Sequence, residues 1–131
     1  MVTAALLFAF PGALTRHLLG AALNSRVPSF PLGTFTSNML GTITSALAYL
    51  LQNLGPIECN ITSTGLLQGL ADGYAGCLST VSTYVAEINL MSNHHAWIYA
   101  CASWVCAQVL LVVLLGSAQW SGVLSVGASC T

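Results

Sequence analysis

Two long stretches of this chain carry no charged side chain. The five formal charges are Arg16, Arg26, Glu58, Asp72 and Glu87, so none lies between Arg26 and Glu58 and none follows Glu87. A transmembrane helix needs about 20 consecutive apolar residues, and each uncharged stretch is longer than that. With 56% hydrophobic and 4% charged residues, against roughly a quarter charged in a soluble domain, the sequence predicts an all-α integral membrane protein.

Four apolar segments account for most of the 131 residues. Only two side chains are Lys or Arg, whereas nucleic-acid binding needs a basic cluster, so the expected surroundings are a lipid bilayer and no nucleic acid. We expect transmembrane helices at about 3–23, 31–51, 63–91 and 96–116, followed by an apolar tail at 117–131.

The third apolar segment is interrupted. Between Gly73 and Tyr84 it carries glycines and four hydroxyl residues, where a membrane span is usually most apolar. We predict a break in the helix there, because irregular backbone at membrane depth survives only in contact with protein or water. Half-helix ends offer N–H groups to an anion and carbonyl oxygens to a hard cation. A kinked structural helix is the alternative on the residues alone.

Polar and small side chains also recur at helical spacing elsewhere. Thr34, Asn38 and Thr42 share one face of the second segment, and Tyr99 and Ser103 share one face of the fourth. The hydroxyls serve either an ion path or helix packing. For Asn38 we favour a functional role over helix packing, because a carboxamide near the middle of the bilayer needs partners for its donors and its acceptor. Stripes of small residues predict close helix contacts at Gly33, Ser37 and Gly41, and at Gly65, Gly69 and Gly73.

Catalytic motifs are missing from the sequence. There is no Gly-x-Ser-x-Gly, phosphate loop or paired carboxylate arrangement, so we do not expect an enzyme. His94 and His95 lack metal-ligand spacing and are interpreted as part of a polar loop at a span boundary.

Three blocks of sequence resemble the small fluoride channel family, called CrcB or Fluc in bacteria and fluoride exporter in fungi and plants. The blocks are GALTRH at 12–17, FPLGTFTSNMLG at 30–41 and GYAGCLSTVSTYVAE at 73–87, in the order and spacing of the family motifs. The run LSTVST is most similar to the second half of the two-domain eukaryotic, fungal-type exporters.

The resemblance implies a four-helix domain at 1–116, with the third helix broken mid-membrane, that assembles as an antiparallel (inverted) dimer or fused pair. It implies a multi-pass protein of the plasma membrane through which fluoride leaves the cell passively, giving fluoride resistance. It also implies a structural Na⁺ at the dimer centre, held by the backbone carbonyls of Gly76 and Ser79, and no organic cofactor. The required partner is a second CrcB-like domain, fused or separate.

Residue roles also follow from the resemblance. Asn38 corresponds to the pore asparagine, and Arg16 and Glu87 to vestibule residues. The two pore phenylalanines of the family correspond to Val81 and Tyr84, and valine has no ring edge to offer an anion. We therefore expect this chain to be one half of a fused or heteromeric channel with a single conducting pore. The expected ion-pathway residues are Thr34, Asn38, Thr80, Val81, Ser82, Thr83, Tyr84, Tyr99 and Ser103.

Two other functions fit the composition. A small four-helix drug or cation exchanger needs a membrane-embedded carboxylate, which the first segment lacks. A non-transporting structural subunit of a membrane complex would use the polar ladders as assembly contacts. Ion flux through reconstituted protein separates these three functions.

Overall fold

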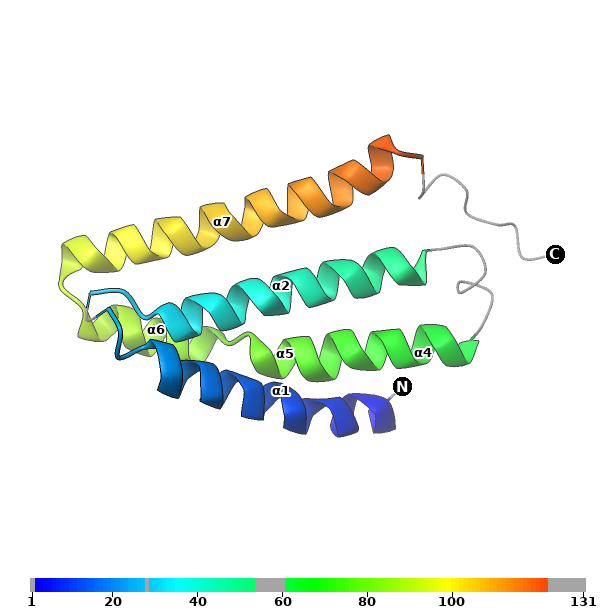
Figure 1. The fold of residues 1–131 in the computed structure, drawn as a ribbon, viewed down its shortest axis with the longest axis horizontal. Coiled ribbons are helices and arrows are strands. Elements are labelled where there is room, and N and C mark those ends of the chain that lie inside the picture. Colours follow the sequence, from blue (N-terminus) through cyan, green and yellow to red (C-terminus); the bar gives the residue numbers. More distant parts are fainter. Residues whose placement is uncertain (1, 28, 54–60, 123–131) are drawn as a thin grey trace.

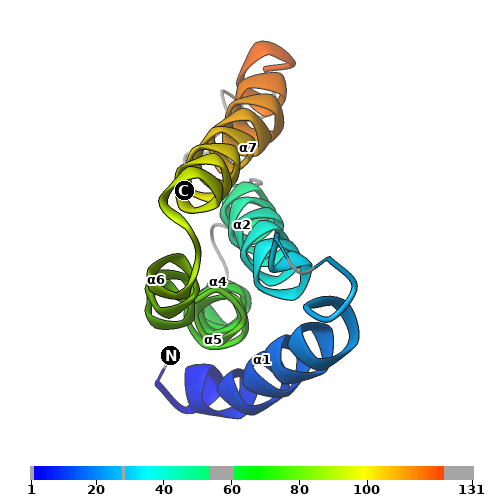
Figure 2. The ribbon, with the colours of Figure 1, turned by 90° about the vertical axis from the view of Figure 1, so that its left-hand side faces the viewer.

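The computed structural model describes residues 2–27, 29–53 and 61–122, and within them all regular structure is helical. Figure 1 shows α1, α2 and the run from α4 to α5 side by side, with α7 along α2. In the end view of Figure 2, α2 lies between α7 and α1, and α6 lies beside α5 and contacts α7. The helices are α1 (Val2–Leu23), α2 (Leu32–Gln52), α4 (Ile61–Gly69), η1 (Leu70–Ala75), α5 (Gly76–Leu78), α6 (Val81–Leu90) and α7 (Asn93–Trp120).

The ends of the last helix differ from the sequence prediction of 96–116. Ser92 occupies the N-cap position, and its Oγ lies 2.7 Å from Nδ1 of His95. His94 and His95 therefore belong to the first turn of α7, and their interpretation as a polar loop is wrong. The helix also continues to Trp120, so the predicted tail begins as helix. Residues 123–131 of that tail lie outside the described residues.

Two of the described helices, α1 and α7, are long and apolar enough by length and composition to cross a membrane. α2 has 21 residues, but its Thr, Ser, Asn and Gly residues lower its hydropathy, and the third segment is divided. Large apolar side chains of α1 and α7 are exposed, among them Leu7, Phe10, Trp97 and Val112. Apolar surface of this extent indicates contact with lipid or with another protein.

α1 packs closely against the helices of the third segment at glycines. A Cβ built on Gly73 would overlap the carbonyl oxygen of Ala5, and one on Gly69 would lie 2.6 Å from the Cβ of Ala4. The sequence prediction that this stripe receives another helix is confirmed at these two glycines, and the helix it receives is α1.

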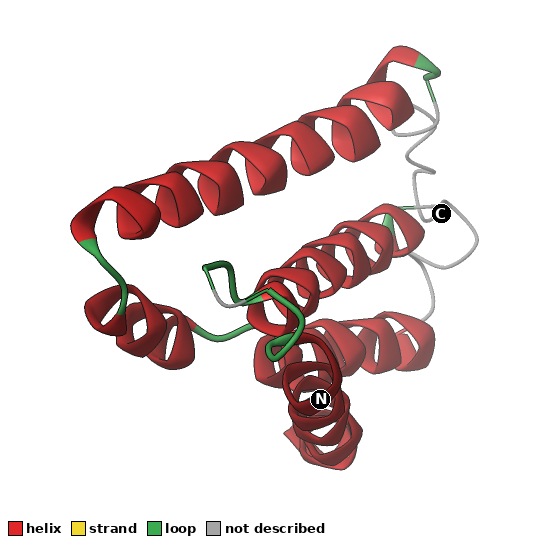
Figure 3. Cartoon of the chain, turned by 60° about the vertical axis from the view of Figure 1, so that its left-hand side comes forward, coloured by secondary structure: helices red, strands yellow, loops and turns green. Residues whose placement is uncertain are grey.

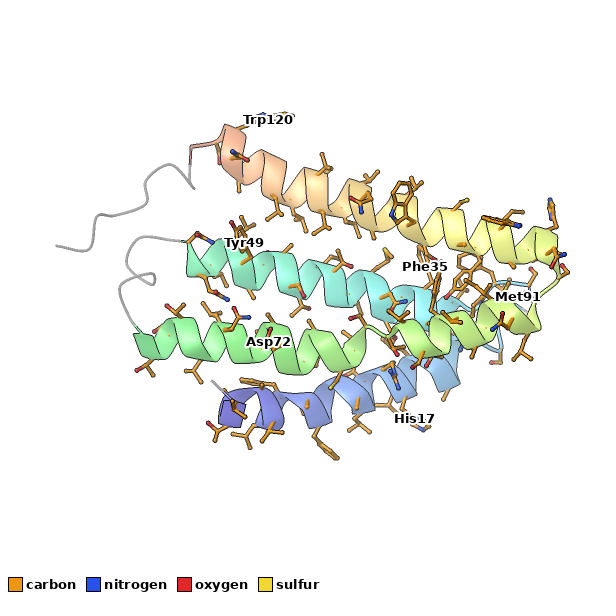
Figure 4. All side chains as sticks on the ribbon, turned by 180° about the vertical axis from the view of Figure 1, so that it is seen from behind. His17, Phe35, Tyr49, Asp72, Met91 and Trp120 are labelled. Atoms are coloured by element: carbon orange, nitrogen blue, oxygen red, sulfur yellow. The ribbon has the colours of Figure 1, made fainter. Side chains whose placement is uncertain are left out.

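The third segment is broken between α5 and α6, as predicted. Ser79 (φ −80°, ψ 145°) and Thr80 (φ −152°, ψ 136°) are extended, and Figure 3 shows this connection as a loop between two helices. Before the break lies a π-helix of six residues, η1, which the sequence pattern did not predict. η1 carries the exposed Asp72, which Figure 4 shows about midway along the run from α4 to α5. Its Oδ1 accepts a hydrogen bond from Nε2 of Gln68 at 2.8 Å.

Candidate functional site

Asn38 of α2 lies opposite the helix break. Its Oδ1 accepts a hydrogen bond from the backbone N–H of Thr80 at 2.9 Å. In a continuous helix this N–H would donate to the carbonyl of Gly76, so α2 satisfies an amide that the break exposes. Only the oxygen of a carboxamide accepts from an N–H. The two N–H donors of Asn38 are therefore turned away from the Thr80 amide.

The close approach of α2 to the break depends on a small residue. A Cβ built on Gly41 would lie 2.9 Å from the Cβ of Ser79 and 3.2 Å from the carbonyl oxygen of Ala75. Since Gly41 stands almost one turn after Asn38 on the same helix, the contact that brings the two backbones together also sets the reach of the Asn38 amide.

An open groove of about 640 Å³ passes this contact. Polar groups from α2, the break, α6 and α7 line it, together with four apolar side chains. Neither of the two basic residues of the chain is among them. The lining residues are Asn38, Met39, Thr42, Gly76, Ser79, Thr80, Val81, Ser82, Tyr84, Ser103, Trp104 and Ala107.

Ser103 is the most deeply buried polar side chain of this groove. It is 8% exposed, and its Oγ has no hydrogen-bond partner among the described residues. Buried hydroxyls are nearly always bonded to protein or to water. The Ser103 hydroxyl is therefore available to a water molecule or an ion in the groove.

A second polar centre forms around the carboxylate of Glu87. Oε1 accepts from the Thr34 hydroxyl at 2.6 Å and from Nδ2 of Asn24 at 3.3 Å, and Oε2 accepts from the Tyr99 hydroxyl at 3.2 Å. We call these four residues the Glu87 cluster. Thr34 is 4% exposed and Tyr99 is fully buried. The cluster joins the end of α1 to α2, α6 and α7.

The groove and the Glu87 cluster adjoin one another. Thr34 and Asn38 are one turn apart on α2, and Tyr99 and Ser103 are one turn apart on α7. Tyr84, which lines the groove, has its ring centre 5.1 Å from that of Tyr99. A row of polar groups therefore leads from the helix break to the Glu87 carboxylate. On α2 and on α7, the groove residue and the cluster residue are about one helical turn, or 5.4 Å, apart along the helix.

The structure gathers most of the candidate residues into these two places. Asn38, Thr80, Val81, Ser82, Tyr84 and Ser103 line the groove, as do Gly76 and Ser79. Thr34, Tyr99 and Glu87 belong to the Glu87 cluster. Arg16, a partly exposed residue of α1, and Thr83 of α6 have no place in either the groove lining or the cluster.

Asn24 is the member of the cluster that sequence analysis missed. It follows the last residue of α1, and it lies 63 residues from Glu87 in the sequence. Asn is common in turns, so nothing in the local pattern distinguishes Asn24 from an ordinary turn residue. Only the packing of the helices brings its side chain to the carboxylate.

Comparison with known proteins identifies the family. The family model described as CrcB-like protein, Camphor Resistance (CrcB), matches residues 3–120. The chain is 46% identical over 119 residues to Fluoride export protein 1 of Neurospora crassa and 40% identical over 125 residues to Fluoride export protein 1 of Candida albicans. It is 36% identical over 115 residues to the Fluoride-specific ion channel FluC of Pseudomonas paraeruginosa. The chain belongs to the CrcB family.

The coverage differs between these relatives. Each fungal alignment covers 91% of this chain but only 22% of the Neurospora protein and 32% of the Candida protein. The bacterial alignment covers 83% of this chain and 86% of the relative. The resemblance stated from the three sequence blocks is thus confirmed, and these relatives are named as export or channel proteins rather than as enzymes.

Proposed function

We propose that this chain is a fluoride-conducting domain of a membrane channel, through which fluoride leaves the cell passively. The observation that carries the proposal is the Asn38–Thr80 contact. It turns the Asn38 N–H donors away from the Thr80 amide, and Asn38 lines the open groove. Fluoride is small and strongly hydrated, so a narrow pore must replace its water with hydrogen-bond donors. The hydroxyls of Ser82 and Ser103 line the same groove, whereas the Thr42 hydroxyl donates to the backbone carbonyl of Asn38 at 2.9 Å.

The lack of an arginine in the groove lining supports an anion that passes rather than one that stays. Arg16 and Arg26 both lie outside the groove lining. Neutral donors stabilise an anion without adding a full opposite charge, which would hold it in place. The names of the relatives, Fluoride export protein 1 and Fluoride-specific ion channel FluC, supply the identity of the ion.

We propose that the chain crosses the membrane four times, with α1 and α7 as outer helices and α2 and the broken third helix as inner ones. This arrangement explains the low hydropathy of α2, because its polar face turns toward the site. The groove is open on one side, and Val81 (75% exposed) and Trp104 (68% exposed) are among its lining residues. A second CrcB-like domain, packed in antiparallel orientation, closes it into a pore.

We propose that the second domain differs from this one. Two copies of this chain would contribute only valine at position 81, and valine lacks the polarised ring edge that stabilises an anion. A domain with an aromatic ring at the matching position would pair it with Tyr84 and form one conducting pore. The match of this chain to only 22% to 32% of the fungal relatives is consistent with such a larger assembly.

The carbonyls of Gly76 and Ser79 fit the proposed Na⁺ at the interface between domains. The Thr80 amide, which would bond to the Gly76 carbonyl in a continuous helix, donates to Asn38 instead. Gly76 is exposed, and Ser79 is a partly exposed residue with extended backbone at the break. Carbonyl oxygens suit a hard cation. A bound cation would hold the two breaks together.

Flux through liposomes tests the proposed function. We expect the chain, reconstituted with its second domain, to release fluoride, measured with a fluoride electrode, and to retain chloride. Residues 1–131 alone should give little flux. Equal chloride flux would contradict the selectivity, robust flux from a homodimer would contradict the need for a different partner, and proton-coupled cation transport would indicate the exchanger. Fluorescence of a tagged chain tests the plasma membrane location.

A further inference from the structure

Asn24 makes three hydrogen bonds from one side chain. Its Oδ1 accepts from the backbone N–H of Gly33 at 2.7 Å and from that of Thr34 at 3.3 Å, and its Nδ2 donates to Oε1 of Glu87 at 3.3 Å. The first two bonds go to the N-terminal turn of α2, and the third goes to α6. A single carboxamide therefore connects α1, α2 and α6.

These bonds leave the Asn24 amide only one orientation. Rotating it by half a turn would place its N–H groups against the two donors of α2 and its oxygen against the carboxylate, so all three contacts would be unfavourable. The α2 backbone thus fixes which side of the amide faces Glu87. Because Pro31 at the N-cap provides no side-chain cap, the amide oxygen of Asn24 also replaces the missing cap.

Gly33 makes room for this arrangement. A Cβ at that position would lie 2.7 Å from Oδ1 of Asn24 and 2.5 Å from the carbonyl oxygen of Leu19. A side chain there would separate the end of α1 from the start of α2. The glycine next to Thr34 therefore has a specific role, because it lets Asn24 reach the amides beside the cluster.

We propose that Asn24 is a positioning residue for the ion path, whose amide holds the Glu87 carboxylate against Thr34 and Tyr99. α6 has no buried residue, so hydrophobic packing does little to fix the place of Glu87. The hydrogen bonds to its carboxylate set that place instead. The role in transport rests on the proposed fluoride path, whereas the coupling between Asn24 and Glu87 does not.

A charge-neutral swap of donor and acceptor tests this role. Asn24→Asp keeps an oxygen for the Gly33 and Thr34 amides, because Asp caps helices as well as Asn does. It loses the donor to Glu87 and faces that carboxylate with a second one. Glu87→Gln supplies a donor from the other side. In the double variant, with Asn24→Asp and Glu87→Gln, one N–H of the residue-87 amide donates to the residue-24 carboxylate and the other to Oγ1 of Thr34, so both bonds to this atom are kept with reversed polarity. Asn53→Asp at the far end of α2, where Nδ2 donates to the Tyr49 carbonyl, is the matched control.

We expect the effect of Asn24→Asp to depend on residue 87. In the reconstituted assembly with Glu87 intact, fluoride flux should fall about tenfold or more, since a bond to a charged group is lost. In the Glu87→Gln background the same substitution should change flux less than about twofold, well below that loss. Asn53→Asp should leave flux unchanged. Thermal melting of the four proteins gives a second cycle with the same expected coupling.

Three results would overturn the proposal. If Asn24→Asp is silent in both backgrounds, Asn24 is only a helix cap. If flux and melting temperature fall equally in both backgrounds, Asn24 has a general structural role. If the melting cycle shows no coupling, the contact with Glu87 has no energetic weight. A wild-type assembly that carries no fluoride defeats the proposed function, and the melting cycle still decides whether Asn24 positions Glu87.

Discussion

The two sides of the helix break are held in place by different forces. Before the break, η1 and α5 pack against α1 and α2 and bury Gly73, Ala75 and Leu78. After the break, α6 buries no residue and packs mainly against α7. α6 is attached to α2 and α7 by hydrogen bonds to the Glu87 carboxylate and by the contact between the Tyr84 and Tyr99 rings. One side is a packed scaffold, and the other is positioned by polar side chains.

This difference places the site at the boundary between rigid and adjustable structure. Segments with few buried apolar contacts open more easily than packed ones. An ion path needs hydrogen-bonding groups in the right places. Substitutions before the break should therefore change the amount of folded protein, and substitutions after it should change transport.

Gly73→Leu tests the scaffold and should have the largest effect. The Cβ alone would overlap the carbonyl oxygen of Ala5, and overpacking of this kind costs about 3 kcal/mol or more when backbone must move. We expect little folded protein from membranes, measured by size-exclusion chromatography. Gly116→Leu is the control, because a Cβ there meets nothing within 4 Å. A normal yield of Gly73→Leu would show that α1 is not tightly packed there.

Asn38 connects the two sides, and its variants separate stability from transport. Asn38→Ala removes the cap on the Thr80 amide, which costs about 1 kcal/mol, and strips the donors from the groove, so flux should be nearly abolished. Asn38→Asp keeps an oxygen for Thr80 but adds a fixed negative charge, so it should melt like the wild type and transport less than Asn38→Ala. Electrode traces and melting curves measure both. Normal transport by either variant would make Asn38 a packing residue.

Thr34→Val tests the polar attachment of α6. Valine has nearly the shape of threonine but lacks the hydroxyl that donates to Glu87 at 2.6 Å. A hydrogen bond to a charged group contributes about 1.5–3 kcal/mol, so flux should fall about tenfold while folded protein is still recovered. Thr44→Val, on the same helix but bonded to the Leu40 carbonyl, should transport normally. Equal flux from both variants would remove Thr34 from the path.

Sodium should have a smaller effect, which is to raise the melting temperature of the paired domains rather than that of this chain alone. A cation that binds only the folded pair stabilises it by about 1–3 kcal/mol at concentrations well above its dissociation constant. We expect a higher melting temperature in Na⁺ than in K⁺ or N-methylglucamine, with no sodium carried along with fluoride. The absence of a sodium-specific shift would remove the cation from Gly76 and Ser79.

Sequence patterns predicted the break and the polar faces that carry Asn38 and Ser103 because these are local features, whereas the roles expected of Val81 and Tyr84 came from the family resemblance. Glycines, hydroxyls and Asn38 at helical spacing identify faces of single helices before any fold is known. The Glu87 cluster could not be predicted in this way, since Asn24 and Thr34 are 63 and 53 residues away from Glu87. The π-helix η1, which contacts α1, also escaped prediction. Arg16 matched a family motif, yet its side chain lies outside both polar centres.

Ser103→Ala should give the smallest effect on stability and the clearest separation from transport. The Ser103 hydroxyl is buried without a partner among the described residues, so removing it relieves a desolvation cost and should leave stability unchanged or raise it by up to about 1 kcal/mol. Flux should nevertheless fall several-fold, because the groove loses a hydroxyl one turn from Tyr99. Ser117→Ala, whose hydroxyl bonds the Leu114 carbonyl at an exposed site, should change neither property. A clear loss of stability in Ser103→Ala would mean that the hydroxyl contributes to the packed scaffold. α7 would then count as scaffold, and α6 alone would be positioned by polar side chains.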